Sequence, residues 1–230
     1  VGAKLYPGLL LVYLIGRRKF REVALTIGFL ILYMVLAAAF FGPRVLGVFA
    51  GFEGPRLATG AAFGMLHMMP WTVTINESVY GFVLKLGMLG VPGASFKAAG
   101  IVAWLYMLAV IAIAFVIGKK KESSSLATAT TWVAILAAAS LRAPFLPQEY
   151  GLFLPLWLLS LVVARMTNVN ARAIGIAVAA WAGLNILWPL EEFHRGAILA
   201  LFVTAIAQAV AWTLIARELR RAWRAEPSAP

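Results

Sequence analysis

The sequence predicts an all-α fold, a polytopic transmembrane helix bundle, and three observations lead to that class. Hydrophobic residues make up 63% of the chain and charged residues only 13%, whereas about 25% of a soluble domain is charged. Six apolar stretches follow one another, and clusters of Arg and Lys fall at every second junction between them. The stretches are continuous apolar runs without the alternation of a barrel strand, so they are expected to be helices.

The six stretches predict about six full spans, preceded by a partial first helix. They cover residues 23–41, 100–118, 125–140, 151–164, 173–190 and 196–216. Several are shorter than the roughly 20 residues of a straight span. The expected organisation is a partial helix and basic turn at 1–21, a span at 22–42, an extracytoplasmic loop at 43–99, a five-helix region at 100–216 and a cytoplasmic tail at 217–230.

The basic residues predict an orientation in the membrane. Thirteen of the 20 fall on one side: Arg17, Arg18, Lys19, Arg21, Lys119, Lys120, Lys121, Arg165, Arg172, Arg217, Arg220, Arg221 and Arg224. Short cytoplasmic loops accumulate Lys and Arg, so we expect a multi-pass plasma-membrane protein with a cytoplasmic C-terminus. Loops beside anionic lipid headgroups account for the net charge of +11, and nucleic acid is not an expected partner.

The start of the chain predicts that residue 1 already lies within a helix. Residue 1 is Val, and the apolar run 5–16 has about a dozen residues, too few to cross a bilayer. We therefore expect a longer parent protein with earlier spans. The chain has no Cys, which excludes disulfides, thiolate metal sites and Cys nucleophiles.

The long outer loop is predicted to carry the functional face. It is too apolar for a disordered linker, and residues 61–69 and 79–89 are expected to form amphipathic helices at the membrane interface. Pro70, Gly90 and Pro92 punctuate these helices. Loops of this length in compact proteins are usually functional.

No motif of a soluble enzyme is present, and the chain contains no Asp. Polar residues instead gather in the loops expected on the outer side: Lys4, Asn76, Glu77, Ser78, Lys85, Arg142, Gln148, Glu149, Tyr150, Glu191, Glu192, His194 and Arg195. Cations at one headgroup level suit a lipid phosphate, and carboxylates beside them suit sugar hydroxyls or proton transfer.

Three segments resemble the C-terminal half of glycosyltransferase family 87. They are Lys-Leu-Tyr-Pro at 4–7, Asn-Glu-Ser at 76–78 before an amphipathic stretch, and Ala-Pro-Phe-Leu-Pro-Gln-Glu-Tyr at 143–150. The resemblance covers most of the chain in order and spacing. It implies a polytopic enzyme of the GT-C type that uses a polyprenyl-phosphate sugar as donor, often mannose, on the outer side of the membrane.

The resemblance implies that Lys4 lies close to the donor phosphate and that Asn76 and Ser78 shape the acceptor side of the long loop. From the chemistry of the outer-loop residues we further expect Arg142 to bind that phosphate and Glu149 to be the catalytic carboxylate. The other residues expected to contact the sugar or the acceptor are Gln148, Tyr150, Glu191 and His194. Related mannosyltransferases often carry His where this chain has Glu149 and Tyr150, and the catalytic Asp of the family would lie upstream of Val1. The chain alone is therefore expected to be inactive.

Each candidate residue also has a structural interpretation. Glu149 and Tyr150 suit an interfacial belt at a helix start. Glu191 and His194 have the spacing of half a carboxylate metal site, but no second such pair exists and a solvated loop is favoured, so neither metal nor cofactor is expected. The functional alternative is a non-catalytic membrane subunit that packs within a larger complex; a transporter is disfavoured because the centres of the spans lack charges.

Overall fold

The computed structural model describes residues 8–59, 61–64, 66, 70–167, 169–185 and 197–225. Over these residues the chain is a bundle of helices joined by short turns, and the all-α prediction is confirmed. The N-terminal helices are α1 (Leu9–Gly16), α2 (Phe20–Phe41), α3 (Arg44–Val48), a π-helical turn η2 (Phe49–Glu53), α4 (Gly54–Thr59), α6 (Pro70–Thr74) and α7 (Val79–Met88). The remaining helices are α8 (Phe96–Gly118), α9 (Ser125–Ser140), α10 (Gln148–Gly151), α11 (Phe153–Ala164), α12 (Ala171–Asn185) and α13 (Ala197–Trp223).

Three of the described helices are long and apolar enough to cross a membrane. They are Phe20–Phe41, Phe96–Gly118 and the stretch Leu201–Trp223 of α13. The predicted count of about six full spans is therefore not reached, because α9, α11 and α12 are apolar but have only 16, 12 and 15 residues. At 1.5 Å per residue, the shortest of these helices covers about 18 Å, well under a hydrocarbon core of about 30 Å.

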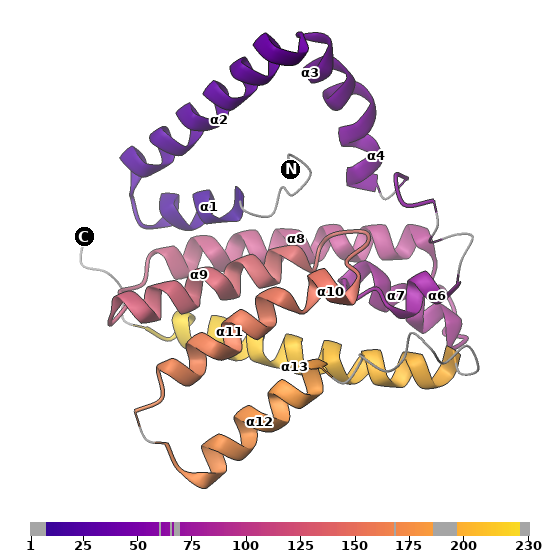
Figure 1. Cartoon of the computed structure of the whole chain (residues 1–230), viewed down its shortest axis with the longest axis vertical. Coiled ribbons are helices and arrows are strands. Elements are labelled where there is room, and N and C mark those ends of the chain that lie inside the picture. Colours follow the sequence, from indigo (N-terminus) through magenta and orange to yellow (C-terminus); the bar gives the residue numbers. More distant parts are fainter. Residues whose placement is uncertain are drawn as a thin grey trace.

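The central body of the bundle consists of α8, α9 and α13, which run roughly parallel to one another in Figure 1. Ten of the 16 residues of α9 are buried, so α9 is the innermost helix. Small side chains such as Ala134 and Ala138 bring its neighbours close. The hydroxyl of Tyr106 on α8 donates a hydrogen bond of 2.7 Å to the carbonyl of Ala138, which ties α8 to α9.

Helix α1 crosses α8 at a pair of glycines. A Cβ on Gly16 would meet the carbonyl oxygen of Phe115, and a Cβ on Gly118 would meet that of Tyr13. Because only backbone lies at this contact, neither position accepts a larger residue without moving a helix. Within the predicted apolar run 5–16, the structure places the short helix α1, which is docked on the bundle.

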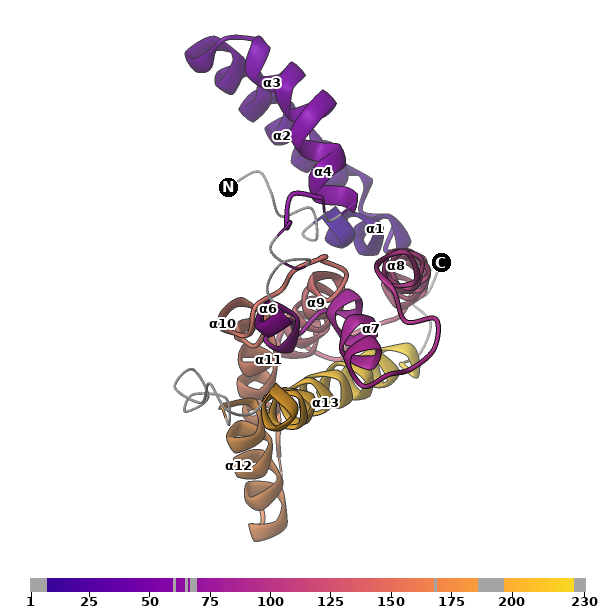
Figure 2. The same ribbon diagram turned by 90° about the vertical axis from the view of Figure 1, so that its right-hand side faces the viewer.

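Helix α2 stands apart from the rest of the molecule. Figure 2 shows α2, α3 and α4 extending away from the central body, with α12 extending from the opposite side. Gly42, at φ 84°, ends α2 and turns the chain back toward the body. None of the 22 residues of α2 is buried, although they are largely apolar, so this helix presents its whole surface to lipid or to other helices.

Helix α7 is confirmed over nearly its predicted extent, 79–89, and most of its residues are buried. The side chains of Val79, Tyr80, Val83, Leu84 and Lys85 are buried. The helix packs against α8, with Tyr80 and Phe96 in ring contact. Of the other predicted interfacial helix, 61–69, the described residues 61–64 form a turn, and most of the remainder lies outside the described residues.

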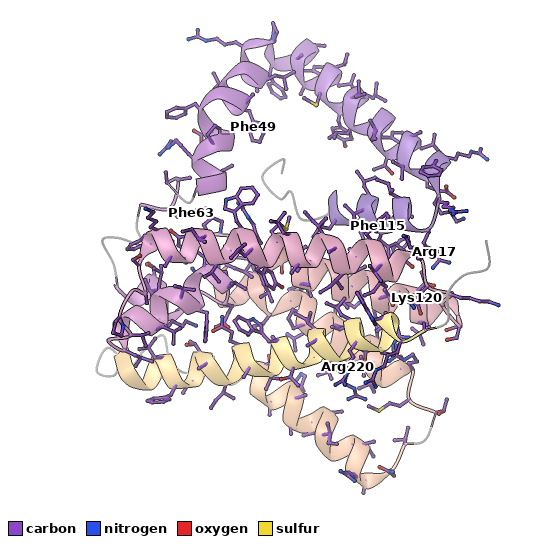
Figure 3. The ribbon with its side chains drawn as sticks, turned by 180° about the vertical axis from the view of Figure 1, so that it is seen from behind. Arg17, Phe49, Phe63, Phe115, Lys120 and Arg220 are labelled. Atoms are coloured by element: carbon purple, nitrogen blue, oxygen red, sulfur yellow. The ribbon has the colours of Figure 1, made fainter. Side chains whose placement is uncertain are left out.

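The basic clusters of the chain meet at one end of the bundle. Figure 3 places Arg17, Lys120 and Arg220 together, at the end remote from Phe63. Arg17 donates a hydrogen bond of 3.4 Å to the carbonyl of Lys120. The predicted one-sided distribution of charge is therefore present in the three-dimensional arrangement of these clusters. We call this end the basic end and the other the loop end.

Candidate functional site

Asn76 connects two loops at the loop end that are about 70 residues apart in sequence. Its side-chain amide donates a hydrogen bond of 2.9 Å to the carbonyl of Pro144. Its side-chain oxygen accepts hydrogen bonds from the backbone N–H groups of Ser78, at 3.2 Å, and Leu146, at 3.0 Å. The backbone N–H of Glu77 adds a bond of 2.8 Å to the carbonyl of Leu146. The segments 76–78 and 144–147 therefore form one unit, here called the loop unit.

Ser78 begins α7 within this unit. Its hydroxyl oxygen accepts a hydrogen bond of 2.8 Å from the backbone N–H of Gly81, a standard helix N-cap. A Cβ at position 81 would overlap the side chain and backbone of Asn76, so glycine is required there. Asn76 and Ser78 are both fully buried, and their polar atoms hold the loop unit together. The predicted role of these two residues, contact with a sugar or acceptor, would require the loop unit to open.

Three buried polar side chains lie beneath the loop unit. The Lys85 ammonium lies 3.8 Å from a carboxylate oxygen of Glu77 and 3.4 Å from the side-chain oxygen of Gln208 on α13. The Gln208 amide donates to the backbone carbonyls of Glu77, at 3.0 Å, and Ser78, at 3.1 Å. None of the three side chains is more than 5% exposed. The cluster thus ties the loop unit to α7 and α13.

Burial changes the acidity of this cluster. Desolvation raises the pKa of Glu77 to about 7, although the nearby Lys85 ammonium acts in the opposite direction. Desolvation likewise lowers the pKa of Lys85, against the pull of the Glu77 carboxylate. Neither carboxylate oxygen of Glu77 accepts a hydrogen bond from the described residues. The pair therefore gains little beyond its Coulomb attraction, and the Glu77 carboxyl titrates near neutrality.

Arg142 is the candidate phosphate ligand that the structure describes. It lies just after α9, and its guanidinium carbon is 4.5 Å from the ring centre of Trp104 on α8, in a cation–π contact. Half-burial lowers the pKa of Arg142 from its ordinary value, but an arginine remains charged at any physiological pH. Because Arg142 stands two residues before Pro144, it adjoins the loop unit, and Tyr150 follows on the other side with 63% of its surface exposed.

The remaining predicted site residues are not placed beside Arg142 by the structure. Lys4, Glu191 and His194 lie outside the described residues. Gln148 and Glu149 form the start of the short helix α10, but their side chains are not among those described. The structure therefore brings together Asn76, Ser78 and the segment that carries Arg142, and leaves convergence with the other residues a prediction.

The position of Gln208 within a long apolar helix predicts an interhelical hydrogen bond, and its bond of 3.4 Å with Lys85 of α7 is such a bond. Sequence reasoning did not foresee its two further bonds to the loop carbonyls of Glu77 and Ser78. A lysine at position 85 of an otherwise apolar helix was the available signal, because a buried ammonium requires polar partners. Within the described residues no group of three His, Asp or Glu side chains could hold a metal ion.

A second polar cluster lies at the basic end. Glu218, 1% exposed, accepts a bond of 2.7 Å from Arg165 and one of 2.9 Å from Arg221. Arg221 also donates to the hydroxyl of Thr131 at 3.0 Å, and that hydroxyl donates to Glu122 at 2.6 Å. These contacts fasten α11 and α13 to α9.

Comparisons with protein-family models, with characterised proteins and with solved structures gave no match to this chain.

Proposed function

We propose that the chain is the membrane-embedded part of a transferase that moves a sugar from a polyprenyl-phosphate donor to an acceptor on the extracytoplasmic face. The observation that supports this function most is the loop unit. It joins two of the three segments that carry the family resemblance, and it does so beside Arg142. In this proposal the loop end faces the cell exterior and the basic end the cytoplasm of a cell expressing the protein at its plasma membrane.

Arg142 would bind the donor phosphate. Guanidinium groups bind phosphate oxygens through two parallel N–H donors, and stacking on Trp104 restricts the orientation of this one. The contact leaves Trp104 54% exposed, so an isoprenoid chain could lie against its ring. Lys4 would supply a second cation to the same phosphate.

The acceptor hydroxyl would attack the anomeric carbon of the donor sugar. The bond from that carbon to the phosphate oxygen breaks, the polyprenyl phosphate leaves with the electron pair, and a carboxylate takes the hydroxyl proton. Glu77 is buried against Lys85 and cannot reach an acceptor outside the loop unit. Glu149 is the carboxylate we propose within this chain, and an Asp from a part of the protein outside this sequence would complete the site.

Binding of polyprenyl phosphate to the purified chain in detergent tests this function. We expect Arg142→Gln to weaken binding about ten-fold, the loss of roughly one charge-assisted hydrogen bond. Arg44→Gln is the matched control, because Arg44 is an exposed arginine after α2 that lies outside the loop unit. Equal binding by the Arg142 variant and the wild type would contradict the proposal.

The alternative is a non-catalytic subunit of a larger membrane complex. The specific observation in its favour is the exposed surface of α2, none of whose residues is buried. Cross-linking from single cysteines placed along α2 in native membranes distinguishes the two functions. Products with an unrelated protein, together with no binding of polyprenyl phosphate, would favour the subunit.

A further inference from the structure

We propose that the arginine pocket at the carboxyl end of α13 binds the phosphodiester headgroup of an anionic membrane phospholipid. The inference is independent of the transferase proposal, because the pocket lies at the basic end and Arg142 at the loop end. Helix α9, with 16 residues, separates the two ends, and at 1.5 Å per residue its length is about 24 Å.

The pocket has a volume of about 560 Å³ and is lined by Arg217, Arg220, Arg221, Arg224 and Ala225. The four arginines follow the spacing i, i+3, i+4 and i+7, so they share one face of the helix. Ligand sites of proteins have volumes of about 300–1,000 Å³, and this one is therefore large enough for a phosphodiester and its neighbouring atoms.

One wall of the pocket is held in a fixed geometry. The Arg221 guanidinium contacts Glu218 at 2.9 Å, Thr131 at 3.0 Å and Glu122 at 3.5 Å. It also donates to the carbonyl of Ala127 at 3.4 Å. A guanidinium held by four partners loses little conformational entropy when it binds a ligand.

The charge of the pocket is only partly neutralised. Glu218 is shared by Arg165, Arg217 and Arg221. Within the described part of the chain, neither Arg220 nor Arg224 forms an ion pair. They are one helical turn apart, so two guanidinium groups can bind the oxygens of one phosphate.

The position of the pocket favours a lipid as the source of that phosphate. It lies at the end of a candidate membrane span that finishes at Trp223. The Trp223 side chain is 46% exposed, and tryptophans in membrane proteins concentrate at the headgroup level. Arg17 and Lys120 lie at the same end (Figure 3). Anionic headgroups gather at such basic surfaces and bind in basic pockets of membrane proteins.

Native mass spectrometry of the full chain in detergent, titrated with phosphatidylglycerol or phosphatidylcholine, tests the inference. We expect the wild type to retain phosphatidylglycerol in preference. The double substitution Arg220→Gln and Arg224→Gln should reduce its occupancy about ten-fold or more, because two charge-assisted hydrogen-bonding groups are removed. The matched control, Arg21→Gln with Lys121→Gln, removes two exposed charges at the same end but outside the pocket, and should leave occupancy almost unchanged.

Three results would overturn the inference. They are equal loss of lipid in the control, equal retention of phosphatidylcholine by the wild type, and displacement of the lipid by excess inorganic phosphate, which would identify a site for a free anion. The substitution Arg220→Lys with Arg224→Lys keeps the charge and removes the two-donor geometry. This lysine variant should lower lipid occupancy by about three-fold. It replaces the glutamine variant in the experiment if the glutamine variant does not fold.

Discussion

At the scale of single residues, the loop end depends on a few buried side chains whose hydrogen bonds are made within the protein. Asn76 uses both its amide group and its oxygen to join loops from distant parts of the sequence. Glu77 has a different character, because its carboxyl is buried without hydrogen bonds to described residues. Asn76 should therefore contribute stability, and Glu77 should make the stability of the protein depend on pH.

Replacing Asn76 by alanine should destabilise the protein by about 3 kcal/mol, because the Pro144 carbonyl and two backbone N–H groups lose their partner in a buried site. Thermal unfolding in detergent measures the change. Asn185→Ala is the matched control, since Asn185 makes an exposed bond of 2.8 Å to the Trp181 carbonyl of its own helix. Equal effects of the two substitutions would show that the loop unit is not a stabilising contact.

Glu77 should make the protein less stable as pH rises. Its pKa is about 7 in the folded protein and 4.5 ordinarily, so the folded state binds the proton more tightly. The stability it contributes is complete below pH 4.5 and falls up to about pH 7, by at most about 1.4 kcal/mol per pH unit. The variant Glu77→Gln should lack this change. We would follow the difference in unfolding temperature between wild type and variant from pH 5 to pH 8; a constant difference would contradict the prediction.

At the scale of elements, close helix crossings and buried ion pairs connect helices that have little amphipathic character. Helix α1 depends on two glycines at its crossing with α8. The basic ends of α11 and α13 are joined by Glu218. Sequence gave no indication of either pairing, because a glycine or a glutamate in an apolar helix does not identify its partner.

Gly118→Ala should displace α1 from α8 and destabilise the protein by about 1–3 kcal/mol, as expected when a well-packed contact is overfilled. The added Cβ would meet the backbone of Tyr13 and the Cα of Gly16, and neither can rotate away. Gly100→Ala in the same helix has no atom within 4 Å of the added carbon. It should leave stability unchanged or raise it by up to about 1 kcal/mol. Thermal unfolding of both variants distinguishes the crossing from a general effect of glycine.

Glu218→Gln should destabilise the protein by about 3 kcal/mol, since it leaves Arg165 and Arg221 without their shared buried carboxylate. Glu22→Gln breaks an exposed pair with Lys19 and should change stability by less than about 0.5 kcal/mol. Unfolding in urea compares them. A small effect of Glu218→Gln would mean that helix packing alone holds the basic end.

At the scale of the whole molecule, the basic clusters share one end and the turn between α7 and α8 lies toward the other. Because the chain has no Cys, single introduced cysteines report their side of the membrane. We expect Val91→Cys to react with an impermeant thiol reagent in intact cells, and Lys121→Cys to react only after permeabilisation. Both positions are exposed. Labelling of both in intact cells would contradict the orientation inferred from charge.

The amino-acid sequence by itself determined the class of this protein, most helix positions and the sharing of one end by its basic clusters. These follow from local properties: apolar runs form helices in a bilayer, serines such as Ser95 and Ser124 cap them, and cations stay beside headgroups. The number of full spans expected from the sequence was too high. Composition shows that a stretch is apolar, but it does not show how far a helix extends before the chain turns.

Only the tertiary structure decided which of the polar residues meet. Glu77 and Gln208 are 131 positions apart and are joined through a backbone carbonyl; Arg221 and Glu122 are 99 apart. Helix α7 has a sequence suited to an interface, and only the structure shows that it packs against α8 with most of its length buried. Such partnerships depend on how helices pack, since an apolar helix buries equally well against lipid or protein and its sequence does not choose between them.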